Sequence, residues 1–401
     1  MRQTLAALDI DALIDGRVLA AEGQTIRASI KIAPLGGLLL ACDAGDPMTG
    51  AADFVTGQTL STAGLLAHTV RQPADRALDV GSGSGAQSIA AATHCHSVMA
   101  TDANSRALEF TRFNAALNGM ANIACRIGDW FEPVEDDHFD LVVCNPPFVV
   151  SPDHDFLFRD AGLTGDEISR RTTEQAAAHL RDGGFAHVMC NWLHEGQDWA
   201  APVREWADGL GCDVWALRFE SMDPVGYAAT WNWHLRERDS ASFERALDRW
   251  LTYFRELEVD RIAMGVVIAR RAPGRANWLR AATLTGPPAG DATDHLLRLF
   301  ATPARLSDEA LLEAQPRPPE GQRVETAQVA RAGGYRDEPA TVRCAPGLGL
   351  TARIDAAAVP AIVACDGSHS LREVIDRTQV GSEAALTAVR RLAELGLLCL
   401  S

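Results

Sequence analysis

The sequence predicts an α/β fold built on a doubly wound, mostly parallel sheet, with a small N-terminal segment and a further C-terminal domain. Three observations support this prediction. A glycine-rich turn joins an apolar strand to a small-residue helix within residues 77–90. Strand and helix patterns alternate after that turn, which indicates parallel strands joined by right-handed crossovers. Polar residues follow successive strands, so the carboxyl ends of those strands should line one crevice.

The glycine turn is the first candidate binding feature. It lies between a predicted buried strand ending at Val80 and a predicted helix over residues 84–93, and it carries Gly81, Gly83 and Gly85. Glycines here let the backbone take positive φ and approach a ligand, and the helix start directs unpaired N–H groups at it. Taken alone, the simpler interpretation is a tight strand-to-helix turn that binds nothing.

Three further predicted strands end in polar residues, and they cover residues 97–102, 123–128 and 139–144. The first ends in Asp102, where nucleotide-binding folds of this type place the carboxylate that accepts both ribose hydroxyls. The other two lead into Asp129-Trp130 and into the run Asn145-Pro-Pro-Phe148. These polar ends raise the odds that the glycine turn belongs to a binding site.

Later strands complete the predicted sheet. Residues 185–190 follow the Gly183-Gly184 turn as the fifth strand, and residues 213–219 and 261–269 are the sixth and seventh. Helices are predicted over residues 59–70, capped near Ser61, and over residues 105–117.

These motifs, in this order and spacing, resemble class I S-adenosylmethionine-dependent methyltransferases over about residues 59–271. The glycine spacing supports this cofactor, because G-x-G-x-G departs from the G-x-G-x-x-G of dinucleotide sites. The Asn145-Pro-Pro-Phe148 run is typical of members that methylate a planar nitrogen, among them release-factor glutamine methyltransferases and base-methylating enzymes. The resemblance implies a Rossmann-like methyltransferase fold of seven strands with an antiparallel seventh.

The resemblance also implies the roles of the site residues. Asn145 and the Pro146 carbonyl would accept the two N–H bonds of the substrate nitrogen, and Phe148 would stack on the planar substrate. Asp79 would reach the methionine amino group or instead brace the loop, Asp102 would hold the ribose, and Asp129 and Trp130 would bracket the adenine. The predicted cofactor-binding residues are Thr62, Asp79, Gly81, Ser82, Gly83, Gly85, Asp102, Ala103, Asp129, Trp130 and Asn145. Thr59 is a further candidate, and helix capping explains both threonines equally well.

The predicted function is therefore methylation of a planar amide or amine nitrogen in a protein, peptide or small metabolite. The alternatives are an RNA or DNA base N-methyltransferase, a small-molecule O-methyltransferase, and a non-catalytic cofactor-binding protein, which the intact Asn145 motif disfavours. The formal net charge of −16 argues against a phosphate-binding groove unless basic residues cluster locally. It fits a neutral or cationic small substrate or a basic protein partner.

The cysteines and the hydrophobic pattern bear on compartment. Nine scattered cysteines do not form a secreted disulfide framework, and Cys144 beside the site is best explained as a small buried residue. His94-Cys95-His96 lacks a second cluster, so no metal site is expected. The sequence shows no signal peptide and no apolar run of about 18 residues, so a cytoplasmic location without membrane association is expected. The oligomeric state stays open, with a homodimer among the alternatives.

Composition also suggests four parts. Residues 1–58 form a lid or accessory segment and residues 59–271 the catalytic domain. Residues 272–345, rich in Pro and Gly, form a linker and accessory region. Residues 346–401 resemble a winged-helix module, with a capping box at Ser370-Leu-Arg-Glu373.

An acidic stretch follows the catalytic motif directly, over residues 151–171. It could select a cationic substrate, or it could be a solvated loop with a helix beginning near Asp166, and the sequence favours neither. Its acids are Asp153, Asp155, Asp160, Asp166 and Glu167.

Overall fold

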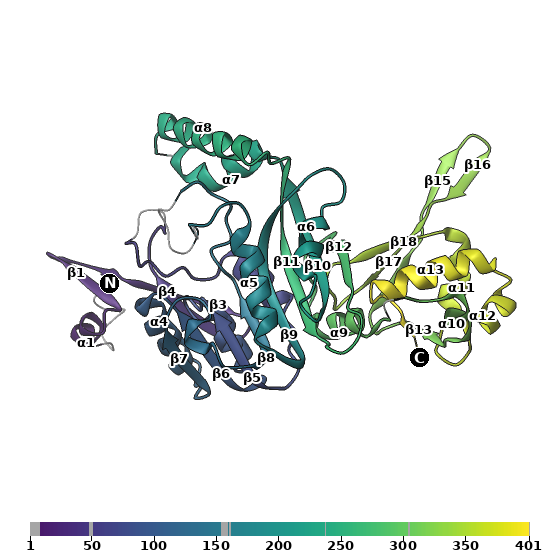
Figure 1. Ribbon diagram of the computed structural model, residues 1–401, viewed down its shortest axis with the longest axis horizontal. Coiled ribbons are helices and arrows are strands. Elements are labelled where there is room, and N and C mark those ends of the chain that lie inside the picture. The colour runs from purple at the N-terminus through teal and green to yellow at the C-terminus, as the bar shows by residue number, and fades with distance from the viewer. Residues whose placement is uncertain are drawn as a thin grey trace.

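The computed structural model describes residues 9–47, 51–153, 159, 162–236, 238–303 and 305–400. A central sheet carries helices on both faces, the N-terminal segment lies at one end, and the C-terminal domain lies at the other (Figure 1). A pair of helices, α7 and α8, stands above one edge of the sheet.

The central sheet has eight strands. In spatial order they are β12 (Leu279–Thr283), β10 (Cys212–Met222), β11 (Arg261–Arg271), β9 (Leu180–His194), β8 (Phe139–Cys144), β5 (Ala74–Val80), β6 (Cys95–Asp102) and β7 (Ile123–Ile127). β11 is antiparallel to both of its neighbours, and the other pairs are parallel. The doubly wound, mostly parallel sheet and its antiparallel seventh strand are confirmed.

One strand more than the expected seven is present. β12 pairs in parallel with the outer edge of β10, from Val214 with Leu279 to Arg218 with Thr283. The sequence analysis placed this stretch in a linker and accessory region. An edge strand of five residues needs only one paired neighbour, and so short a stretch carries little periodic signal of its own.

β9 begins earlier than expected, at Leu180, and runs through the Gly183-Gly184 pair that was predicted as a turn. Its register with β8 shifts between Phe139 and Leu141, so the two glycines occupy a bulge. A Cβ on Gly184 would lie 3.0 Å from the carbonyl oxygens of Arg181 and Asp140. Glycine is needed here for close backbone approach, and a bulge gives the same local signal as a turn.

Helices cover both faces because the buried strands are apolar on both sides. Leu141 and Val143 of β8 enter one core with residues of α2 and α3, whereas Val142 and Cys144 enter the opposite core with residues of α5 and α6. These helices, with α4 beside β6 and β7, are α2 (Leu60–Ala67), α3 (Ala86–Ala91), α4 (Ser105–Leu117), α5 (Glu167–Ala178) and α6 (Ala201–Ala207). A short 3-10 helix, Glu132–Val134, follows β7.

The N-terminal segment forms two hairpins of its own. Its elements are α1 (Ile10–Asp15), β1 (Leu19–Glu22), β2 (Thr25–Ala28), β3 (Ile30–Leu35) and β4 (Leu38–Asp43). The buried Asn114 side chain on α4 bonds to both the N–H and the C=O of Ala41, and Asn118 does the same for Leu39 nearer the surface. These amides dock the β3–β4 hairpin on the catalytic domain.

The two helices α7 (Pro224–Arg236) and α8 (Ser240–Glu256) form a hairpin between β10 and β11. Their buried aromatic residues pack on one another and on the segment after β8. Arg238, in the turn between the helices, forms an ion pair of 2.6 Å with Asp46 of the N-terminal segment. The hairpin therefore contacts parts of the chain on both sides of the Asn145-Pro-Pro-Phe148 run.

The C-terminal domain combines small sheets and helices. Its elements are α9 (Thr293–Ala301), α10 (Asp308–Glu313), β13 (Pro316–Arg317), β14 (Gln322–Glu325), β15 (Gln328–Arg331), β16 (Gly334–Asp337), β17 (Ala340–Cys344), β18 (Thr351–Ile354), a 3-10 helix (Ala356–Ala358), α11 (Val359–Ala364), α12 (Leu371–Thr378), α13 (Ser382–Glu394) and β19 (Cys399–Leu400). The capping box of Ser370 and Glu373 at the start of α12 is present. Phe300 of α9 packs edge-on against Phe185 of β9, at a centroid distance of 5.3 Å, and so ties this domain to the central sheet.

Over the part of the chain that the structure describes, no helix has both the length and the apolar character that a membrane span requires.

Replacing Asn114 with alanine should lower the free energy of unfolding by about 1–3 kcal/mol, because buried backbone groups of Ala41 lose their partners. Equilibrium urea denaturation measures the change. Asn118→Ala is the matched control, and its loss should be smaller because water can reach the groups it leaves. Equal losses for the two variants would contradict the importance of burial at Asn114.

Candidate cofactor and substrate site

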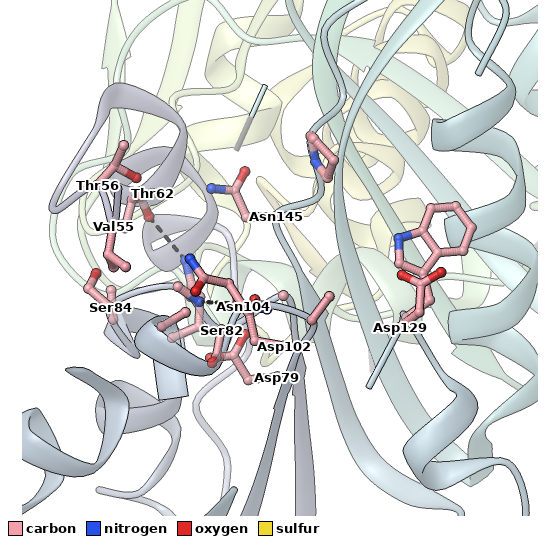
Figure 2. Close-up of a pocket in the computed structure, with 18 of the residues that line it drawn as sticks. Val55, Thr56, Thr62, Asp79, Ser82, Ser84, Asp102, Asn104, Asp129 and Asn145 are labelled. Atoms are coloured by element: carbon pink, nitrogen blue, oxygen red, sulfur yellow. Dashed lines mark hydrogen bonds between the residues drawn. The ribbon is translucent and has the colours of Figure 1, made fainter. Parts of the chain in front are cut away.

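A cavity of about 480 Å³ lies at the carboxyl ends of β5, β6 and β8. Figure 2 shows Thr62 on one side of it, Asp79 and Asp102 below, Asn145 above, and Asp129 on the far side. The predicted site residues that line it are Thr62, Asp79, Gly81, Ser82, Gly83, Asp102, Ala103, Asp129, Trp130 and Asn145. The crevice predicted from the strand ends therefore exists.

The three glycines of the turn have different structural roles. Gly81 and Gly83 have φ of 68° and 54°, and a Cβ on either would meet no atom within 4 Å. Gly85 also has positive φ, but its Cβ would lie 3.0 Å from Thr111 of α4, and Gly85 is absent from the cavity lining. Gly81 and Gly83 open the backbone to the cavity, whereas Gly85 permits close packing of α3 on α4.

Asp102 links the end of β6 to the glycine turn. Its Oδ2 accepts from the Gly83 N–H and its Oδ1 from the Asn104 N–H, each at 2.8 Å. Burial raises the pKa of this carboxyl, and the two N–H donors oppose that rise. Each carboxylate oxygen has two lone-pair positions, so each can still accept one hydroxyl from a ligand in the cavity.

Asp79 is a second buried carboxyl in the cavity wall. Burial raises its pKa to about 7, while hydrogen bonds from Ser88 lower it and the charge of Asp102 raises it further. Its Oδ2 accepts from the Ser88 hydroxyl on α3 at 2.6 Å, so it braces the helix that follows the turn. It also lines the cavity, and the two roles considered from the sequence are therefore compatible.

Asn145 presents an unused acceptor. Its Nδ2 donates to the Ser61 hydroxyl at 3.3 Å, and Ser61 in turn bonds to Thr59 at 2.9 Å. Among the described residues, its buried Oδ1 has no hydrogen-bond partner. Because a buried acceptor without a partner is costly, this oxygen is suited to receive an N–H from a ligand.

The cap of α2 differs from the sequence interpretation. Thr59, rather than Ser61, is the N-cap, since its hydroxyl accepts from the Thr62 N–H at 3.1 Å. Ser61 is thereby free to face Asn145. Only the tertiary contact shows this, because both hydroxyls suit a helix start equally well.

Two residues of the catalytic motif lie differently from their expected roles. Phe148 is 6% exposed and packs in the core rather than in the cavity wall, so its expected position as a stacking partner is not the observed one. Its N–H donates to the Pro146 carbonyl at 2.8 Å, and Pro146 is buried. Pro147 lines the cavity instead. An apolar side chain after a buried strand finds the core first, which the motif alone could not reveal.

Several residues that line the cavity are not predicted from the sequence, namely Phe54, Val55, Thr56, Gly57, Ser84, Ala86, Gln87, Asn104, Ala107, Leu163, Ile168 and Arg171. The run at residues 54–57 is held to Asp43 in both directions, because the Val55 N–H donates to the Asp43 carboxylate and the Val55 carbonyl accepts from the Asp43 N–H. Just before this run, the Asp53 carbonyl accepts from the Asn104 amide. Of these residues, Asn104 could have been found from the sequence, because it lies two residues after Asp102 and directly before the predicted helix, where it is the N-cap of α4.

The acids after the motif are engaged within the protein. Asp153 accepts from Arg249 and Trp250, Asp166 accepts from the Leu193 N–H, and Glu167 pairs with Arg170 and Arg171. Asp155 and Asp160 lie outside the described residues. For Asp153, Asp166 and Glu167 the contacts favour a structural role over selection of a cationic substrate.

Cys144 is 1% exposed, and burial raises the pKa of its thiol well above the usual range, so it is an unreactive core residue. Among the described residues, no group of three or more His, Cys, Asp or Glu side chains is arranged to hold a metal ion.

The geometry agrees with comparisons to known proteins. Residues 54–197 match the family model of the methyltransferase small domain. This segment is similar to the methyltransferase small domain. It includes every residue that lines the cavity.

Relatives of this domain include protein methyltransferases. The chain is 34% identical over 131 residues to release factor glutamine methyltransferase of Xylella fastidiosa, covering 29% of the chain and 47% of that relative. It is 34% identical over 125 residues to ribosomal protein uL3 glutamine methyltransferase of Bradyrhizobium diazoefficiens, covering 28% of the chain and 39% of the relative. The chain thus spans about half the length, or less, of these relatives.

Among solved structures, the chain is similar to the ribosomal protein L11 methylase of Lactobacillus delbrueckii subsp. bulgaricus. The sequence identity is 25% and the TM-score 0.30, and the match covers 40% of this chain and 72% of that one.

S-adenosylmethionine, the cofactor of methyltransferases, fits the residues of this cavity. The space beside Gly81 and Gly83 admits a ligand to the backbone, and the Asp102 oxygens retain acceptor positions for two hydroxyls. Asp79 offers a carboxylate to an ammonium group.

If Asp102 accepts the ribose hydroxyls, Asp102→Ala should weaken binding of S-adenosylmethionine by about 1.5–3 kcal/mol, the range for hydrogen bonds to a charged group. Calorimetric titration measures this. Asp182→Ala, at an exposed acid near the start of β9, is the control and should bind as wild type does. Wild-type affinity in Asp102→Ala would remove Asp102 from the site.

A cationic amino group binds the ionised form of Asp79, so cofactor affinity should rise as pH rises through its pKa of about 7. Between pH 8 and pH 6 the affinity for S-adenosylhomocysteine, which keeps the amino group, should fall by up to roughly 10-fold. Calorimetry across this range tests the effect. Asp79→Asn should flatten the profile, and a profile unchanged by that substitution would assign the titration to another group.

Proposed function

We propose that this chain transfers a methyl group from S-adenosylmethionine to a planar nitrogen, and that the acceptor is a glutamine side chain in a protein. The observation that carries the proposal is the buried Oδ1 of Asn145 in the cavity wall, which has no hydrogen-bond partner within the described part of the chain. The nitrogen of the same amide, Nδ2, already donates to the Ser61 hydroxyl. The Asn145 side chain is therefore oriented with its oxygen available as an acceptor.

The chemistry requires such an acceptor. The cofactor supplies an electrophilic methyl group and its own leaving group, so the protein has mainly to position the nitrogen. A planar amide nitrogen is a weak nucleophile because its lone pair is delocalised. Asn145 Oδ1 accepts a hydrogen bond from one N–H of the substrate nitrogen. The Pro146 carbonyl accepts one from the other N–H, because it has a second lone pair beyond the one bonded to the Phe148 N–H. The lone pair would then be directed toward the methyl group. The new N–C bond would replace the C–S bond of the cofactor, and the nitrogen would release one of its two protons to water.

The cavity residues hold the cofactor in this proposal. Asp79 binds the amino group, Asp102 accepts the ribose hydroxyls, and Asp129 and Trp130 flank the base. The backbone at Gly81 and Gly83 lies against the methionine moiety, where a side chain would block access. Thr62, Ser82 and Ala103 complete the wall.

Protein glutamine is the preferred acceptor for two reasons. The relatives named above are glutamine methyltransferases that act on a release factor and on a ribosomal protein. The charge of −16 suits a basic protein partner better than a nucleic acid.

All nine cysteines are free thiols, which suits a reducing, cytoplasmic compartment.

A base-methylating enzyme is the second candidate, since the Asn145 motif would serve an exocyclic amine as well as an amide. Transfer of labelled methyl from S-adenosylmethionine to lysate fractions, with and without nuclease, discriminates the two. Label that remains in protein after nuclease supports the glutamine proposal, and label lost with the nucleic acid supports the second candidate. Purified release factor and ribosomal protein uL3 are the first defined substrates to try.

Asn145→Ala should lower kcat by roughly 10²–10³-fold while leaving cofactor affinity nearly unchanged, because it removes one preorganised contact to the reacting centre. Asn145→Asp keeps an acceptor of similar shape and should retain more activity than alanine. Single-turnover methylation measures both, with calorimetry as the control for an intact cavity. Wild-type rates in both variants would exclude the planar-nitrogen mechanism and point to a hydroxyl or thiol acceptor.

A further inference from the structure

The α7–α8 hairpin lies outside the matched methyltransferase segment, yet it contacts the stretch of chain that follows the Asn145 motif. It spans residues 224–256, beyond residues 54–197. α7 begins two residues after the carboxyl end of β10, and parallel β8 ends at the same edge of the sheet, just before Asn145. Figure 1 shows the two helices above this edge.

Three sets of hydrogen bonds join the hairpin to the segment that continues from the catalytic motif. The Val150 N–H donates to the Tyr227 hydroxyl at 3.0 Å. Asp153 accepts from Arg249 Nε and from Trp250 Nε1, each at 2.8 Å. The Gly165 N–H donates to the Tyr253 hydroxyl at 2.8 Å. The first of these contacts lies five residues from Asn145.

Tyr227 is itself held rigidly. It is fully buried, its ring lies 6.2 Å from that of Trp250 and 5.9 Å from that of Phe254, and its hydroxyl also accepts from the Asn191 amide of β9 at 2.6 Å. Because the Tyr227 hydroxyl is bonded to both Asn191 of β9 and Val150, it fixes the backbone after the motif relative to the central sheet. Burial also raises the pKa of Tyr227, so the hydroxyl stays neutral.

The motif needs such a support because it leaves the sheet. Pro146 and Pro147 have no N–H to donate, and among the described residues the partner shown for the Phe148 N–H lies within the motif, at the Pro146 carbonyl. Past the end of β8, the Val150 N–H is therefore the first backbone donor of the run for which the structure shows a partner outside the motif. Phe148 and Val150 are buried in the core on either side of that bond.

We infer that Tyr227 is a positioning residue for the reaction: through Val150 it fixes the backbone that carries Asn145 and the Pro146 carbonyl, and the α7–α8 hairpin is the strut that holds it. The inference rests on the proposed function of that motif. Misplacement of a reacting group by about 1 Å can cost on the order of 10²-fold in rate, so loss of one anchor should appear in kcat.

The test compares Tyr227→Phe with Tyr253→Phe in the full chain. Each variant loses one tyrosine hydroxyl of the same hairpin, but Tyr253 holds Gly165, which lies 20 residues after Asn145. Tyr227→Phe should lower kcat by roughly 10-fold or more. Its affinity for S-adenosylhomocysteine should stay within about 2-fold of wild type, because none of the cavity-lining residues is altered. Tyr253→Phe should keep a kcat near wild type.

Rates are expressed per cofactor-binding site, so that a variant that is merely less stable, and therefore less folded, does not mimic the effect. A wild-type kcat in Tyr227→Phe overturns the inference. If Tyr227→Phe does not fold, Asp153→Asn is the deciding variant, because it weakens the bonds to Arg249 and Trp250 and leaves the Tyr227 side chain in place. A reduced kcat at unchanged cofactor affinity supports the inference, and a wild-type kcat overturns it.

Asn145→Ala, assayed in parallel, separates the two levels of the proposal. Loss of activity in Asn145→Ala with wild-type kcat in Tyr227→Phe overturns only the positioning role. Wild-type activity in both overturns the proposed function as well.

Discussion

The bond between the Gly83 N–H and the Asp102 carboxylate is the constraint on which the site depends. It ties the turn after β5 to the end of β6, while the N–H groups of Gly81 and Ser82 bond to the Thr101 carbonyl beside it. The turn can then keep positive φ at Gly81 and Gly83 and face the cavity. Without this carboxylate, the two strands would still pair, but the Gly83 N–H would lose the partner that holds it at the end of β6.

Asn145 is supported from two directions. On one side, its Nδ2 donates to the Ser61 hydroxyl, which is itself bonded to the Thr59 hydroxyl at the start of α2. On the other side, the backbone that follows is anchored through Val150 to the α7–α8 hairpin. The acceptor oxygen is left between them without a partner among the described residues, so the fold has oriented this amide before any substrate binds.

The domain that lines the cavity and the parts that hold it come from different regions of the chain. Every lining residue falls between Phe54 and Arg171, within the matched methyltransferase segment. Asp43 and the β3–β4 hairpin hold the wall at residues 54–57 from the N-terminal side, and Tyr227 and Arg249 hold the segment after the motif. The cavity thus belongs to the segment that matches the family model, and its walls are held partly by segments outside it.

The sequence by itself determined the order of the central strands along the chain, the glycine turn, and the gathering of Asp79, Asp102, Asp129 and Asn145 at one edge. It could do so because these features are local: β8 and α4 begin and end where their apolar patterns predict. Only the tertiary structure decided the eighth strand, the burial of Phe148, the facing of Ser61 toward Asn145, and the bond from Tyr227 to Val150. Each of these depends on a partner far away in the chain, and a local pattern contains no information about which distant group will satisfy a strand edge, an apolar ring or a backbone N–H.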